Sequence, residues 1–108
     1  MTKKQVKEYL SRYRECMARV QRLRIDAEQF SASADSIKKE IEGCIIQSSD
    51  IERLISQHCD LMEREILTRK YIYGETLELI AERLNYSVRH IQRIIDRAAE
   101  GIGEFLTC

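Results

Sequence analysis

The stretch TLELIAERLNYSVRHIQRII, residues 76–95, decides the fold, because its apolar residues, caps and turn have the spacing of a helix-turn-helix. Ala81 is small and stands in the middle of the first helix, where a second helix must cross closely. Asn85 stands at the turn, and after glycine asparagine best tolerates a positive φ there. The hydroxyl of Ser87 can cap a second helix, from which Ile91 faces back toward the first. The segment therefore predicts two helices joined by a tight turn.

The second of these helices carries basic and amide side chains on its outer side. Such groups are the ones with which a helix reads base edges in the major groove of DNA. Asp96 and Glu100 are expected further along the same side, where they would repel phosphate. We therefore expect only the first two turns of the helix to enter the groove. The outward-facing residues are Arg89, Gln92, Arg93 and Arg97.

Capping signals divide the C-terminal half of the chain into three helices. Asp60 and Glu63 have capping-box spacing, which starts a helix over residues 61–73 that Gly74 ends. Thr76 caps the next, and the last runs on toward the C-terminus. The apolar stripe of the last helix outlasts the motif, so its end is expected to pack on the N-terminal helices or on another subunit.

The N-terminal half carries an apolar heptad that runs without a slip from Val6 to Cys44. Alternating three- and four-residue spacing of this kind is typical of helix-on-helix packing. Residues 31–36, SASADS, interrupt it, because serine and aspartate favour caps and turns. The simplest arrangement is an antiparallel hairpin whose first helix ends near Phe30 and whose second starts near Asp35 or Ser36. The alternative is one continuous helix that pairs with another subunit.

The second helix of this hairpin is expected to break near Ser48, because Ser49 and Glu52 again have capping-box spacing. Its apolar residues should face its partner helix. They are Ile37, Ile41, Cys44, Ile45, Ile51, Leu54, Ile55 and Cys59.

Composition agrees with an all-α protein: among 108 residues there is no proline, there are four glycines, and 33% are charged. Residues 1–59 are expected to form a helical hairpin or coiled-coil arm, and residues 60–108 a helix-turn-helix module. Formal net charge is zero, but residues 1–30 carry eight Lys or Arg against four Asp or Glu. The C-terminal module is not basic as a whole, so its positive charge is concentrated on one short helix.

Several classes of function are not expected. The four cysteines include no pair with metal-ligand spacing and should be small buried thiols. No glycine-rich phosphate loop or nucleophile elbow is present in the sequence, so we expect no catalytic residue, cofactor, metal ion or small-molecule substrate. No apolar run reaches the ~20 residues that span a bilayer, and no signal peptide is recognised. A cytoplasmic protein is therefore expected.

Residues 65–99, EILTRKYIYGETLELIAERLNYSVRHIQRIIDRAA, resemble region 4 of the sigma-70 family. The N-terminal heptads beginning KEYLSRYRECMARV, followed by such a module, resemble small phage and prophage transcriptional regulators of the ArpU and RinA type. Sigma region 2 is lacking, so the chain resembles no complete sigma factor. The matching positions are Lys70, Tyr71, Gly74, Thr76, Ile80, Ala81, Glu82, Leu84, Ser87, Ala98 and Ala99.

The resemblance implies that the start of the last helix reads double-stranded DNA. By position, Val88, Arg89 and Arg93 would face bases, although the family commonly has a polar residue where Val88 stands. The residues implied near phosphates or groove edges are Thr76, Ser87, His90 and Gln92.

The resulting hypothesis is a sequence-specific, DNA-binding transcriptional regulator of phage or prophage type. A homo-oligomer is expected, with a dimer favoured, and the N-terminal arm is expected either to set dimerisation or to contact RNA polymerase. One alternative is a DNA-packaging oligomer like the small terminase subunit of a phage. Another is a module that binds a protein rather than DNA.

Overall fold

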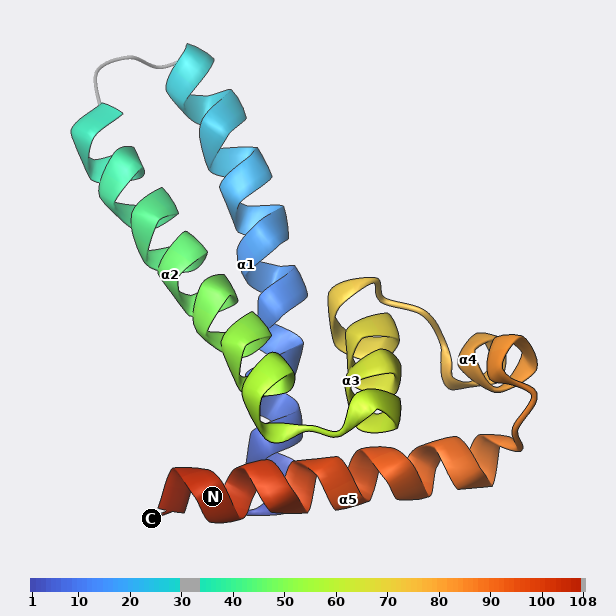
Figure 1. Cartoon of the computed structure of the whole chain (residues 1–108). Coiled ribbons are helices and arrows are strands. Elements are labelled where there is room, and N and C mark those ends of the chain that lie inside the picture. The colour runs from blue at the N-terminus through green and yellow to red at the C-terminus, as the bar shows by residue number, and fades with distance from the viewer. Residues whose placement is uncertain (30–33, 108) are drawn as a thin grey trace.

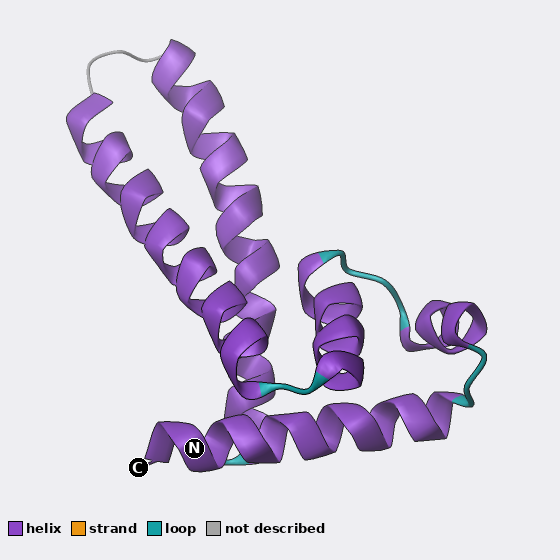
Figure 2. Ribbon diagram, in the orientation of Figure 1, coloured by secondary structure: helices purple, strands orange, loops and turns teal. Residues whose placement is uncertain are grey.

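In a computed structural model, which describes residues 1–29 and 34–107, every regular element is helical. The prediction of an all-α protein is therefore confirmed over this part of the chain (Figure 2). No helix within it is long and apolar enough to cross a membrane. The elements are α1 (Lys3–Gln29), α2 (Ala34–His58), α3 (Leu61–Leu67), the π-helical turn η2 (Thr68–Ile72), α4 (Leu77–Leu84) and α5 (Val88–Thr107).

Two long helices and one crossing helix set the shape of the molecule. Figure 1 shows α1 and α2 side by side as an antiparallel hairpin, with α5 passing across the foot of the hairpin. The short helices α3 and α4 lie beyond α1, above the N-terminal half of α5. The predicted hairpin is thus confirmed, and the continuous-helix alternative is wrong. The predicted end near Phe30 lies outside the described residues.

The predicted break in α2 near Ser48 is wrong. The helix runs unbroken from Ala34 to His58, and the Ser48 hydroxyl donates a hydrogen bond of 2.9 Å to the carbonyl of Cys44, one turn earlier. A serine that bonds to its own helix in this way has no cap to make. Ser49 lies in the interior of the same unbroken helix, so its capping-box spacing with Glu52 is not used.

The apolar residues of α2 are buried unequally along the helix. Ile51, Ile55 and Cys59 are buried at the foot of the hairpin, where α5 and α3 also cover them. Higher up only α1 covers α2, so Ile41 is half-buried. Ile45 was expected to face α1, yet it is 41% exposed because it lies at the edge of a seam between only two helices.

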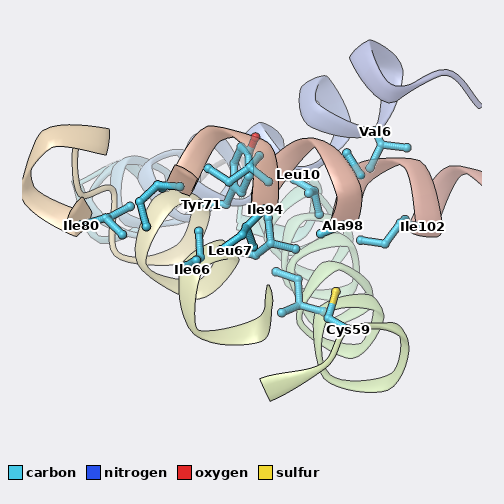
Figure 3. Packing of buried hydrophobic residues seen from close by; sticks show 14 of the residues in the cluster. Val6, Leu10, Cys59, Ile66, Leu67, Tyr71, Ile80, Ile94, Ala98 and Ile102 are labelled. Atoms are coloured by element: carbon cyan, nitrogen blue, oxygen red, sulfur yellow. The ribbon is translucent and has the colours of Figure 1, made fainter. Parts of the chain in front are cut away.

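One apolar core joins the foot of the hairpin to the C-terminal helices (Figure 3). Val6 and Leu10 of α1 belong to the same buried cluster as Ala98 and Ile102 of α5. Gly103 permits this close approach, because a Cβ there would lie 2.6 Å from the Met1 carbonyl oxygen. Of the two partners expected for the end of α5, the N-terminal helices are the ones observed.

The helix predicted over residues 61–73 changes its winding before it ends. Its start is as predicted: the Asp60 carboxylate accepts from the Glu63 amide at 2.8 Å, and the Glu63 carboxylate accepts from the Asp60 amide at 3.0 Å. The α-helix stops at Leu67 and continues as the wider turn η2, in which Tyr71 is buried and Ile72 only half-buried. Such insertions of a π turn leave no clear signal in an apolar pattern.

Ion pairs and a glycine then fix the path from η2 to α4. Gly74 ends the segment with φ of +74°, as expected of a glycine after a helix. The Glu75 carboxylate lies between two guanidinium groups, 3.1 Å from Nη1 of Arg69 and 3.6 Å from Nε of Arg83. Glu75 thereby links η2 to the last turn of α4 and helps to set the position of α4.

Candidate nucleic-acid interface

The helix α4 begins and packs as the sequence predicts. The hydroxyl oxygen of Thr76 accepts a hydrogen bond of 3.2 Å from the Leu79 amide and caps the first turn. Ile80 is fully buried and Ala81 is 5% exposed, facing α5 and the core. A small residue at this position lets the second helix approach closely.

The turn after α4 has the predicted left-handed residue. Asn85 has φ of 61° and ψ of 43°, and its amide donates back to the carbonyls of Ala81 and Glu82. The next amide, that of Tyr86, also donates to the Ala81 carbonyl at 3.0 Å. These bonds satisfy carbonyls at the end of α4 and reverse the chain within three residues.

The start of α5 is capped by the predicted serine. The Ser87 hydroxyl oxygen accepts a hydrogen bond of 3.1 Å from the His90 amide, and the Ser87 carbonyl accepts from the Ile91 amide at 3.1 Å. Ile91 is fully buried and Ile94 is 6% exposed, so one side of α5 is committed to the core. The opposite side of its first two turns is left to solvent. We call the unit made by α4, this turn and the first two turns of α5 the α4–α5 corner.

Two arginines dominate the exposed side of the corner. Arg89 and Arg93 lie one helical turn apart, and both are exposed. Their guanidinium groups form no ion pair or hydrogen bond with any described residue. His90 and Gln92 are also exposed beside them, whereas Val88 is half-buried and packs against the core.

Arg97 is separated from this group by its partners. Its Nε lies 3.1 Å from the Glu63 carboxylate and its Nη2 lies 3.5 Å from the Asp60 carboxylate, both at the start of α3. Although Arg97 is exposed, its charge is already compensated within the chain. Of the eight residues expected at the site, six lie in the cap and first two turns of α5, Thr76 caps α4, and Arg97 is tied to α3.

The acidic residues further along α5 are paired with lysines of α1. Asp96 bonds to the ammonium group of Lys7 and lies 3.8 Å from that of Lys3, so it faces α1. The Glu100 carboxylate lies 3.7 Å from the same Lys3 nitrogen. Seven-residue spacing puts Asp96 on the side of α5 that carries Arg89, and Glu100 on the side that carries Arg93, as expected. Lysines of α1 offset the negative charge of both.

One aromatic residue of the site was missed in the sequence. Tyr86, in the turn, is 39% exposed, and its ring centroid lies 4.7 Å from that of His90 with the ring planes tilted by 58°. The four-residue spacing between Tyr86 and His90 is the feature of the sequence that could have predicted this ring contact. The pair extends the exposed surface of the corner from α5 onto the turn.

The described part of the chain contains thiols and carboxylates, but they are not gathered into a metal site. No group of three or more His, Cys, Asp or Glu side chains could hold a metal ion there. Burial raises the pKa of Cys59 to about 11, and Cys16 is also buried, so these two thiols are protonated near neutral pH. Cys44 is half-buried, and Cys108 lies outside the described residues.

Comparisons with known proteins do not assign this chain to a family. No protein-family model matches the chain, and neither a curated protein nor a solved structure was found to be similar to it.

Proposed function

We propose that this chain is a cytoplasmic, sequence-specific DNA-binding protein that regulates transcription, of the phage or prophage type. The observation that carries the proposal is the pair of exposed, uncompensated guanidinium groups on Arg89 and Arg93 at the start of α5. A guanidinium fork can donate two hydrogen bonds to a guanine edge, or contact phosphate, at each position.

The charges around the corner support the entry of α5 by its first two turns. Arg97, Asp96 and Glu100 are already engaged with residues of α3 or α1, so the free positive charge is confined to the beginning of the helix. His90, Gln92 and the Tyr86 ring flank it and offer groups for phosphate or groove-edge contacts. The side chains of Thr76 and Ser87 already cap helices, so their part in binding would be to hold backbone amides toward phosphate.

The proposal requires that both arginines matter for binding. We expect the Arg89→Ala/Arg93→Ala variant to bind a labelled random-sequence duplex about tenfold more weakly, or worse, at low salt, because two charges that can neutralise phosphates are lost. Fluorescence anisotropy across a salt series measures this, and wild-type affinity should fall steeply as salt rises because bound counterions are released.

A matched control separates this site from general positive charge. Arg22→Ala/Arg24→Ala removes two exposed arginines of α1, far from the corner in the sequence, and should leave the affinity within about twofold of wild type. Equal losses in the two double variants would mean that binding is diffuse. Absence of wild-type binding even at ~50 mM salt would contradict the DNA-binding function and favour a module that binds protein.

A further inference from the structure

The hairpin has two broad faces: η2 packs against one of them, and the C-terminal end of α5 reaches the foot of the other. On the face that η2 covers, the guanidinium of Arg14 lies against Gly74. Met17 and Ile72 line a hollow of about 340 Å³ between α1 and η2 on the same side. Figure 1 shows that α3 and α4 both lie beyond α1 on one side of the hairpin.

The other face, which we call the outer face, is lined by Arg12, Cys16 and Arg19 of α1, Cys44 and Leu54 of α2, and Phe105 of α5. It holds a hollow of about 210 Å³ beside the two cysteines and another of about 350 Å³ at the foot of the hairpin. Phe105 is 49% exposed and Leu106 is 37% exposed at the edge of the second hollow. The outer face thus combines open space with exposed apolar side chains.

The two helices of the hairpin carry opposite charges. On the outer face the charged residues of α1 are Arg12, Arg19 and Glu15, and those of α2 are Glu40, Asp50 and Arg53, so the face is net basic along α1 and net acidic along α2. Arg19 and Glu40 meet across the hairpin at 3.6 Å, and their side chains remain 53% and 48% exposed. Each charge therefore has room for a second partner outside its own chain.

We propose that the outer face binds a second copy of this chain, with α1 of one protomer beside α2 of the other in a four-helix bundle. A twofold axis parallel to the hairpin places basic α1 against acidic α2 twice. It also keeps each residue at its own height, so Arg19 meets the partner's Glu40. Arg12 lies two turns below Arg19 and is level with the partner's Asp50.

This arrangement is consistent with the rest of the molecule. The helices α3 and α4 lie beyond α1, so the two α4–α5 corners do not compete for space. The C-terminal end of α5, with Phe105, reaches the outer face at the foot of the hairpin and would meet its counterpart there. Tyr9 and Leu54 are only half-buried beside the larger hollow. Helices of a second copy would cover them as a four-helix bundle covers its core, and the charged residues would form the rim.

This dimerisation rests on the proposed function, because a dimer of a DNA-binding protein can bind two half-sites of DNA at once. Its test contains no DNA, so its failure is distinguishable from a failure of DNA binding. Sedimentation equilibrium of the full chain should show a monomer–dimer equilibrium. Arg12→Glu/Arg19→Glu and Glu40→Lys/Asp50→Lys should each weaken dimerisation about tenfold or more, because like charges then face each other.

Mixing the two variants gives the sharpest outcome. An equimolar mixture restores opposite charges at both contacts, so a heterodimer should form with near wild-type affinity. Phe105→Ser, at an exposed position, should also weaken self-association. Circular dichroism of each variant checks that the helices are intact.

The control reverses charges on the same two helices but away from the outer face. Arg24→Glu/Glu42→Lys exchanges one exposed charge on each helix and should leave the dimerisation constant within about twofold. A monomeric wild type at ~100 µM, tens of times above a typical micromolar dissociation constant, would overturn the proposal. A dimer unchanged by both outer-face variants would overturn it equally, because the copies would then meet elsewhere.

Discussion

Asn85 and Gly74 are the residues with positive φ in the described part of the chain, and they stand on either side of α4. Their backbone conformations fix the direction in which α4 enters and leaves the α4–α5 corner. Asn85→Ala should lower the free energy of unfolding by ~1 kcal/mol, because alanine tolerates the left-handed region poorly. Asn85→Gly should be neutral or slightly stabilising. Urea unfolding followed by circular dichroism compares them, and an equal loss in both variants would mean that the asparagine side chain matters.

Burial of two titratable side chains makes the stability of the fold depend on pH, which the sequence did not reveal. Burial raises the pKa of Cys59 from 9.0 to about 11, and that of Tyr71 from 10.0 to about 12. The unfolded chain loses these protons first, so unfolding becomes easier as pH rises above about 9. Cys59→Ala should flatten the loss of stability between pH 9 and 11 in urea titrations. An unchanged slope would show that the thiol is not the titrating group.

Local signals predicted individual residues well where the partner is near in sequence. The Asp60–Glu63 box and the Thr76, Asn85 and Ser87 positions all follow from atoms within a few residues of one another. The ion pair of Arg97 with Glu63 spans 34 residues and depends on how α5 crosses α3, which no local pattern contains. The sequence alone could therefore not predict that Arg97 pairs with Glu63 of α3.

At the scale of elements, α2 shows how a capping signal can be overruled. Ser48 is itself buried, and the seam continues in phase from Cys44 to Ile51, which favours one continuous helix over a break. In a continuous helix Ser49 is an ordinary exposed position, so Ser49→Ala should be neutral or stabilise the protein by up to ~0.5 kcal/mol. If Ser49 capped a helix, the same change would cost ~1 kcal/mol. The sign of the change in urea unfolding decides between the two.

The heptad predicted which helices pair but not how completely they bury one another. Apolar spacing identifies a seam, and α1 and α2 do meet along it. Whether a residue is buried depends on its position within the seam: Val20 is 1% exposed, whereas Ile45, at the edge of the seam, is 41% exposed. The π turn η2 was equally beyond prediction, since one widened turn shifts later side chains without changing the apolar pattern.

At the scale of the whole molecule, the foot of α1 is part of the support for α5. Leu10 is fully buried in the cluster that also contains Ile94 and Ala98. Leu10→Ala should cost ~2–5 kcal/mol of stability, and the loss should be felt in α5 although more than eighty residues separate the two positions. Hydrogen exchange measured by mass spectrometry should therefore show faster exchange in α5 as well as in α1.

A conservative change at the tip of the hairpin provides the comparison for that experiment. Ile25→Ala alters a residue of α1 that is 55% exposed and should leave exchange in α5 unchanged. If Leu10→Ala accelerated exchange in α1 and α2 alone, the hairpin and the C-terminal helices would unfold as separate units. Joint acceleration would instead mean that a loss at the foot of the hairpin also loosens the helix that carries Arg89 and Arg93. In that case DNA affinity of the Leu10→Ala variant should fall as its temperature approaches the midpoint of unfolding, and not before.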